Sequence, residues 1–176
     1  MASQQQNSGV IKKIYKTRKT ILELLKSQGY DTEDEIDFSI NEIHAMYQNK
    51  ELDMLLENKD TSKKTYVKYH IHSGLRPQII HDIIDDLFHT EELLNPDRDN
   101  LVIITKDPPN DTLTSLLEQI FADDGVYIII MNIARLQFNI LEHEMVPRHE
   151  IMTNDDVVEF KKRYNIKDIS NLPTLS

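Results

Sequence analysis

The sequence predicts an α/β domain with a largely parallel sheet covered by helices, followed by a small α+β domain at the carboxyl end. Strand-like and helix-like segments alternate between residues 65 and 134, and such alternation favours parallel strands joined by helical crossovers. Two of the strand-like segments are continuously apolar, as is typical of strands buried on both faces. The pattern changes beyond Arg135, so we expect a domain boundary near residue 138.

The amino-terminal third of the sequence is predicted to be mainly helical. Residues 1–9 read as a polar tail, and a helical apolar period then runs from Val10 to Gly29, the residue type expected just past a helix end. Ser39 and Glu42 form a capping box for a helix that reaches about Tyr47. The segment "ELDMLLEN" (51–58) is predicted as a further helical piece, and the loop "KDTSKK" (59–64) follows.

The central segments supply the sheet and its helices. Residues 65–72 alternate like a strand, and Pro77 opens a helix, since proline is favoured in the first helical turn. The apolar face of this helix consists of Ile79, Ile80, Ile83, Ile84, Leu87 and Phe88. The strand "LVIIT", the helix "TLTSLLEQIF" and the strand "VYIIIMNIA" come next, separated by turn-forming residues.

Beyond Arg135 the predicted elements are short. "FNIL" (138–141) and "EIMT" (150–153) are strand-like runs, and Thr153 with Asp156 can cap a helix from Asn154 to Tyr164.

Composition restricts the possible functions. The absence of cysteine excludes disulfides and thiolate zinc sites and fits a reducing intracellular compartment. No run of about 18 apolar residues is present, and the chain does not start like a signal peptide, so we expect a soluble, non-secreted protein. The net charge of -10 argues against free binding to nucleic acid.

Charge is unevenly distributed along the chain. Residues 10–28 carry six basic side chains against Glu23 alone, a net +5, whereas residues 31–60 carry ten acidic side chains against Lys50 and Lys59, a net -8. Solvated helix faces are the simplest interpretation of both segments.

The histidines do not predict a metal site. His143 and His149 are six residues apart with Pro147 between them, whereas two ligands on one helix face need a spacing of four and an unbroken helix. His70 and His72 share one face of a predicted strand, but no third ligand can be named. Phosphate-binding glycine loops and the serine-hydrolase elbow are also absent from the sequence. We therefore expect no metal and no cofactor.

The two ends of the chain resemble one known family. Residues 141–175 are similar to the start of the assembly domain of the fifth subunit of eukaryotic-type DNA-directed RNA polymerases, a domain shared with the corresponding subunit of archaeal polymerases. The motif combines His143, Glu144, a hydrophobic pair, Pro147 and His149 with a capped helix, the basic-aromatic "KKRY" and a Leu-Pro pair. Residues 14–47 are similar to the amino-terminal helix and the acidic segment of the eukaryotic subunit.

The resemblance implies a non-catalytic subunit with two domains. Residues 10–138 would form the jaw domain, which flanks downstream duplex DNA, and residues 139–176 the assembly domain, which docks on the largest polymerase subunit. The implied docking residues are Glu142, His143, Glu144, Met145, Val146, Pro147 and His149. Members of the family continue past the Leu-Pro pair, whereas this sequence stops at Ser176, so either the carboxyl end is missing or the protein is divergent.

The resemblance also implies a DNA-proximal loop at the tip of the jaw. The matching stretch is "TKDPPND", in which Lys106, Pro108, Pro109 and Asn110 could approach a phosphate backbone or groove. A plain turn between a strand and a helix is the alternative. The implied partners are the largest and other polymerase subunits, and the implied location is the nucleus, or a virus factory or virion for a viral protein.

Two other classes of function stay open. The family's jaw is similar in fold to restriction-type nucleases, but isoleucine at position 104 stands where the metal-binding carboxylate is required. Glu57 with Lys59, and Glu159 with Lys161, have the nuclease spacing in unsuitable positions. A free-standing transcription adaptor outside the polymerase is the remaining alternative.

Overall fold

The computed structural model describes residues 2–147, 152–168 and 172, and it divides into two compact units, residues 1–139 and 140–176. The helices and strands of the first unit are α1 (Ala2–Ser27), α2 (Ile40–Asn49), β1 (Met54–Glu57), β2 (Lys64–His70), α3 (Pro77–Ile84), β3 (Asn100–Thr105), α4 (Asp111–Asp124) and β4 (Tyr127–Asn132). Short 3-10 helices lie at Glu33–Glu35 and Ile133–Leu136, and α3 continues as a π-helix over Asp85–Thr90.

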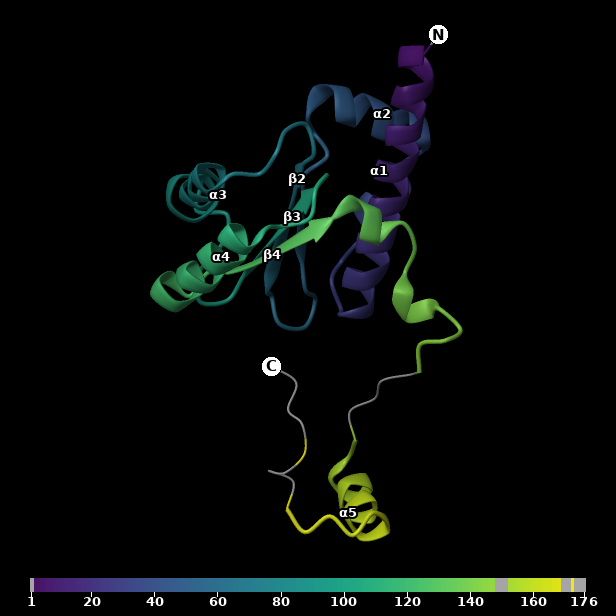
Figure 1. Ribbon diagram of the computed structural model, residues 1–176, viewed down its shortest axis with the longest axis vertical. Coiled ribbons are helices and arrows are strands. Elements are labelled where there is room, and N and C mark those ends of the chain that lie inside the picture. The colour runs from purple at the N-terminus through teal and green to yellow at the C-terminus, as the bar shows by residue number, and fades with distance from the viewer. Residues whose placement is uncertain (1, 148–151, 169–171, 173–176) are drawn as a thin grey trace. The chain divides into compact units, whose positions relative to one another are not determined.

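The first unit is built on one four-stranded sheet with the order β1-β2-β3-β4 (Figure 1). β2, β3 and β4 are parallel, whereas β1 pairs antiparallel with β2 in the register Met54↔Val67. The predicted largely parallel sheet with helices is therefore confirmed, with one antiparallel edge.

β1 corrects the prediction of a helical piece at residues 51–58. Met54 and Leu56 are buried and Leu55 is exposed, which is the alternation of a strand with one buried face. Asp53 fixes this pairing, because its carboxylate accepts hydrogen bonds from the Tyr69 backbone N–H (2.7 Å) and from Lys68 Nζ (2.7 Å). Tertiary pairing thus overrides the local helical pattern.

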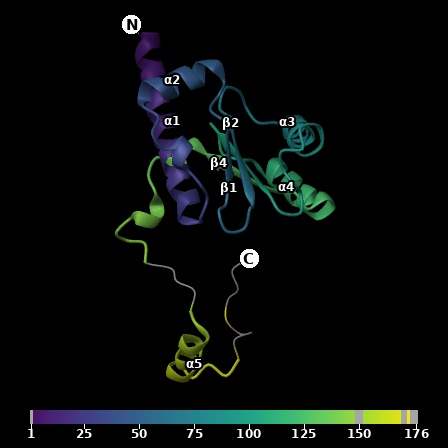
Figure 2. The same ribbon diagram turned by 180° about the vertical axis from the view of Figure 1, so that it is seen from behind.

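Helices cover both faces of the sheet and give it two cores (Figures 1 and 2). On one side α1 and α2 pack with Val67, Val102 and Ile104. On the other side α3 and α4 pack with Leu101 and Ile103. Alternate residues of β3 thus enter opposite cores, which explains why its sequence is continuously apolar.

Local sequence signals set most helix boundaries. Gly29 has φ +89° and ends α1 in a Schellman motif, in which the Tyr30 N–H donates to the Leu25 carbonyl (3.1 Å) and the Gly29 N–H to the Lys26 carbonyl (3.0 Å). The predicted Ser39 capping box is present at the start of α2. α1 begins at Ala2, earlier than predicted, so that residues 2–9 of the expected polar tail are helical.

The second unit contains a 3-10 helix at Ile140–Glu142 and α5 (Asn154–Arg163). The Thr153–Asp156 capping box of α5 is present as predicted. The strand expected at residues 138–141 is wrong, because its second half forms the 3-10 helix. Of the run 150–153, the first two residues lie outside the described part, and residues 152 and 153 have no regular structure.

No helix in the described ranges is long and apolar enough to cross a lipid bilayer.

Candidate functional site

The first candidate site is the loop after β3, which contains Lys106, Pro108, Pro109 and Asn110. Its base is fixed by two side chains at the ends of neighbouring strands. Thr105 Oγ1 donates to the Asp107 carbonyl (2.7 Å), and Asn132 Nδ2 donates to the Lys106 carbonyl (2.9 Å). The loop is thus held at the carboxyl edge of the parallel strands.

The tip of this loop is open to solvent. Lys106, Pro108 and Pro109 are exposed, and Asn110 caps α4 by accepting a hydrogen bond from the Leu113 N–H (2.9 Å). The cap uses the side-chain oxygen of Asn110 as an acceptor, and its amide NH₂ group can still donate to a ligand. The structure therefore brings all four residues to one exposed edge.

A shallow hollow adjoins the loop. It has a volume of ≈ 220 Å³ and is bounded by residues 105–110 on one side and by Ser73, Gly74 and Leu75 after β2 on the other. The carboxyl ends of parallel strands are the usual place for ligands in α/β sheets. Lys106 is the only basic residue among those that line it.

The second candidate site is the polar corner formed by Glu142–Pro147. It follows the Ile140–Glu142 helix as a tight turn, in which the His143 N–H donates to the Ile140 carbonyl (3.1 Å) and the Val146 N–H to the His143 carbonyl (2.8 Å). His143 Nδ1 also accepts from the Met145 N–H (3.2 Å), which favours the tautomer with its proton on Nε2. The corner is ordered by local hydrogen bonds; His149, the last predicted docking residue, lies outside the described residues.

Apolar side chains are strongly exposed around this corner. Met145 is 81% exposed, and Ile140 and Leu141 are exposed to a similar degree as Val158 and Tyr164 on the α5 segment. None of the described residues from 140 onward belongs to a buried hydrophobic cluster. Exposed apolar groups at this density are typical of a surface that is covered by a partner protein.

His70 and His72 have separate local contacts. His72 stacks on Tyr47 with ring centroids 4.7 Å apart, and His70 Nε2 lies 3.0 Å from Ser73 Oγ. Among the described residues no group of three His, Asp or Glu side chains could hold a metal ion.

The nuclease alternative gains no support from the geometry. Ile104 is fully buried in β3. Lys59 contacts Asp31 (3.1 Å) and Glu33 (3.5 Å), which belong to the acidic segment. Glu159 and Lys161 lie on α5, in the other unit from the sheet.

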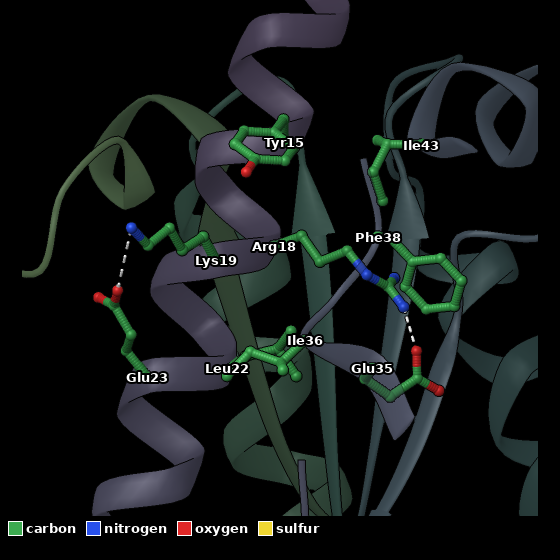
Figure 3. A pocket seen from close by; sticks show the side chains of 9 residues that line it. All are labelled: Tyr15, Arg18, Lys19, Leu22, Glu23, Glu35, Ile36, Phe38 and Ile43. Carbon is green, nitrogen blue, oxygen red and sulfur yellow. Dashed lines mark hydrogen bonds and ion pairs between the residues drawn. The ribbon is translucent and has the colours of Figure 1, made fainter. Parts of the chain in front are cut away.

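A groove beside α1 was not predicted from the sequence. We call it the α1 groove; it has a volume of ≈ 120 Å³ and is lined by Tyr15, Arg18, Lys19, Leu22, Glu23, Glu35, Ile36, Phe38 and Ile43 (Figure 3). Arg18 crosses it from α1, donating to the Leu52 carbonyl (2.9 Å), pairing with Glu35 and stacking over the Phe38 ring at 5.3 Å. The available sequence signal was a basic residue on the apolar face of a helix, between Ile14 and Leu22.

Comparison with known proteins identifies the second unit. The family model described as RNA polymerase Rpb5, C-terminal domain, matches residues 138–176. Residues 138–176 are therefore similar to the C-terminal domain of the Rpb5 family. The match includes the polar corner and α5, so the resemblance carried by His143, Pro147 and the helix cap is confirmed.

Similarity to RNA polymerase subunits extends over most of the chain. DNA-directed RNA polymerase V subunit 5A of Arabidopsis thaliana is 22% identical over 168 residues, which cover 92% of this chain and 71% of the relative. DNA-directed RNA polymerases IV and V subunit 5B of the same plant is 24% identical, covering 93% of this chain and 73% of the relative. Subunit RPABC1 of RNA polymerases I, II and III from Caenorhabditis elegans is 24% identical, covering 93% and 78%. The prediction of a non-catalytic polymerase component is confirmed by this relationship.

Proposed function

We propose that this Rpb5-type chain is a non-catalytic subunit of a multisubunit DNA-directed RNA polymerase, which docks on the largest subunit and flanks downstream DNA. In this proposal residues 10–138 act as the jaw domain and residues 139–176 as the assembly domain. The observation that carries the proposal is the Rpb5 C-terminal domain match over residues 138–176, combined with the exposed apolar side chains of the same segment. The nucleus is the expected location for a cellular protein; a virus factory or virion is the alternative.

The assembly role follows from what the second unit leaves uncovered. Ile140, Leu141 and Met145 lie on the 3-10 helix and the adjoining polar corner, so they share a short stretch of chain. Removing such side chains from water contributes about 25 cal/mol per Å² of apolar area to association, and the loss of motional freedom on binding offsets part of this contribution. The polar corner fixes the backbone from which they project.

The docking role is tested by a charge placed on the exposed apolar surface. Because Met145 is 81% exposed, Met145→Asp should leave the folding of the chain unchanged. The same substitution would bury an unpaired carboxylate in the complex, and we expect recovery with the largest subunit in a pull-down to fall about tenfold or more. Leu55→Asp, at a 39%-exposed position of β1, is the matched control and should assemble normally.

Equal recovery of both variants would count against docking through the polar corner. Copurification separates the proposal from a free-standing adaptor: the tagged chain should bring down the two largest polymerase subunits in stoichiometric amounts, and their absence would favour the adaptor.

A further inference from the structure

The α1 groove has no role in the proposed docking or in the contact with DNA. We propose that it binds an acidic, amphipathic segment of a partner protein. An apolar side chain of that segment would lie in the groove, and the segment's carboxylates would contact Lys12, Lys16 and Lys19 of α1. The surface lies entirely within the first unit.

The groove offers an apolar seat. Leu22 and Ile43 are buried at 2% and 1% exposure, while Tyr15 and Ile36 keep 37% and 42% of their surface exposed. Figure 3 shows these side chains on both sides of Arg18, which spans from α1 toward Phe38. A partner's aliphatic or aromatic side chain would remove the exposed apolar area of Tyr15 and Ile36 from water.

The ridge beside this seat is basic. Lys12, Lys16 and Lys19 are spaced four and three residues apart on α1, so their side chains project from one face of the helix, and all three are exposed. Tyr15 lies on the turn between them, one helical turn before Lys19, and both line the groove. The three lysines span about 10 Å along the helix axis.

The carboxylates at the groove are already paired within the chain. Glu23 lies 3.8 Å from Lys19, and Glu35 pairs with Arg18. In the part of the chain that the structure describes, Lys12 and Lys16 have no acidic partner within salt-bridge distance. The ridge therefore presents positive charge that a partner's carboxylates can neutralise.

A protein segment fits this surface better than a nucleic acid does. The acidic segment 31–60 forms one wall of the groove through Glu35, Ile36, Phe38 and Ile43. Its exposed Glu33 and Asp34 would repel a polyanion that carries charge along its whole length. A peptide can place carboxylates against the lysine ridge and an uncharged apolar residue in the groove. The pattern of charge and apolar surface is that of helix-in-groove or acidic-motif recognition.

The test uses the full chain and three probes. The first probe is a synthetic helical peptide with glutamates on one face and leucine and phenylalanine on the adjacent face. The second is a scrambled peptide of the same composition, and the third is a DNA duplex. Two-dimensional NMR should show the first peptide shifting the amide signals of Tyr15, Leu22 and Ile36. We expect Lys12→Glu with Lys16→Glu to weaken this binding about tenfold.

Matched controls separate the groove from general electrostatics. Lys161→Glu with Lys162→Glu on α5 changes the net charge by the same amount and should weaken binding by less than about threefold. Ile36→Glu should weaken it about tenfold, whereas Leu55→Glu, equally exposed on β1, should not. Equal effects of the two lysine pairs, equal binding of the scrambled peptide, tighter binding of the duplex, or no detectable binding of the first peptide would each overturn the proposal.

Discussion

At the scale of single residues, Arg18 joins α1 to three positions of the segment that follows it. It is 3% exposed on α1, and it contacts the Leu52 carbonyl, Glu35 and the Phe38 ring. A buried charge of this kind is costly unless it is paired, and removing one partner strands the others. We expect Arg18→Met to lower the free energy of unfolding by about 3 kcal/mol in urea denaturation.

Lys19 is the matched control for Arg18. Its ion pair with Glu23 is 3.8 Å long and its side chain is 66% exposed, so solvent screens the interaction. Lys19→Met should change the free energy of unfolding by less than about 0.5 kcal/mol. A similar loss in both variants would show that the pairing of Arg18 adds nothing beyond its place on the helix.

Asp99 is a buried carboxylate whose charge is stabilised by hydrogen bonds. It is 2% exposed, and it accepts from the backbone N–H groups of Lys64 (2.7 Å) and Asn95 (2.9 Å) and from Arg98 Nε (3.0 Å). Burial raises the pKa of Asp99, but the hydrogen bonds from Arg98 and the two backbone groups outweigh burial and hold the pKa below its usual value of 3.8.

A lowered pKa in the folded state predicts a stability that depends on pH. As pH falls, the Asp99 carboxylate takes up its proton in the unfolded chain before it does so in the folded chain. The contribution of Asp99 to the free energy of unfolding is therefore complete above about pH 4 and is lost as pH drops through its folded pKa. In Asp99→Asn this part of the acid destabilisation should be missing. Urea denaturation at a series of pH values gives the free energy of unfolding as a function of pH. Below about pH 4 this free energy should fall less steeply for the variant than for the unchanged protein, and parallel slopes would contradict the assignment.

At the scale of elements, the contrast between β1 and β3 shows how far the sequence predicts this fold. β3 is recognisable alone because both of its faces are buried, so its sequence is apolar throughout. β1 has four residues, with buried Met54 and Leu56 beside exposed Leu55. β1 forms a strand because it pairs with β2 and because Asp53 accepts hydrogen bonds from β2. These contacts join residues distant in sequence, so the local pattern of residues 51–58 does not reveal them.

Helix caps were predictable because they are local. The Ser39, Thr153 and Gly29 signals each involve residues within five positions of one another. The 3-10 helix at Ile140–Glu142 was not, since an apolar run of three or four residues has no period that separates a strand from a helical turn.

The end of α1 gives a prediction at this scale. A side chain at Gly29 would have to adopt φ +89°, and its Cβ would come within 3.1 Å of Asn58 Nδ2, which donates to the Gln28 carbonyl (2.7 Å). Gly29→Ala should therefore cost about 2 kcal/mol of stability. Gly125→Ala has the same backbone strain at φ +73° but open space around its Cβ, and thermal or urea unfolding should show a smaller loss.

At the scale of the whole molecule, the loop after β3 and the α1 groove differ in how the sequence encodes them. The loop after β3 is continuous in sequence, and its prolines mark it as a turn, so its residues could be named in advance. The α1 groove is assembled from α1 and residues 35–43, with Arg18 hidden in an apolar period. Only the packing of α1 against α2 reveals it.

The charge of the whole chain decides how it can meet DNA. With a net charge of -10, the isolated chain should bind duplex no more tightly than the roughly 10⁻⁴ to 10⁻⁶ M of ordinary non-specific binders. Inside a polymerase the large subunits would hold the duplex, and the exposed Lys106 and Pro108 need only touch it. This difference separates binding by the free chain from contact in the complex.

Lys106→Glu with Pro108→Ala should therefore leave incorporation into the polymerase intact and reduce protection of downstream DNA in a footprint of the complete enzyme. The lost protection should be largest at low salt, because ions screen the contribution of Lys106. Lys26→Glu, an exposed position near the end of α1, is the control and should footprint normally. If the double variant and the control give the same footprint at low salt, the loop after β3 is only a connection between β3 and α4.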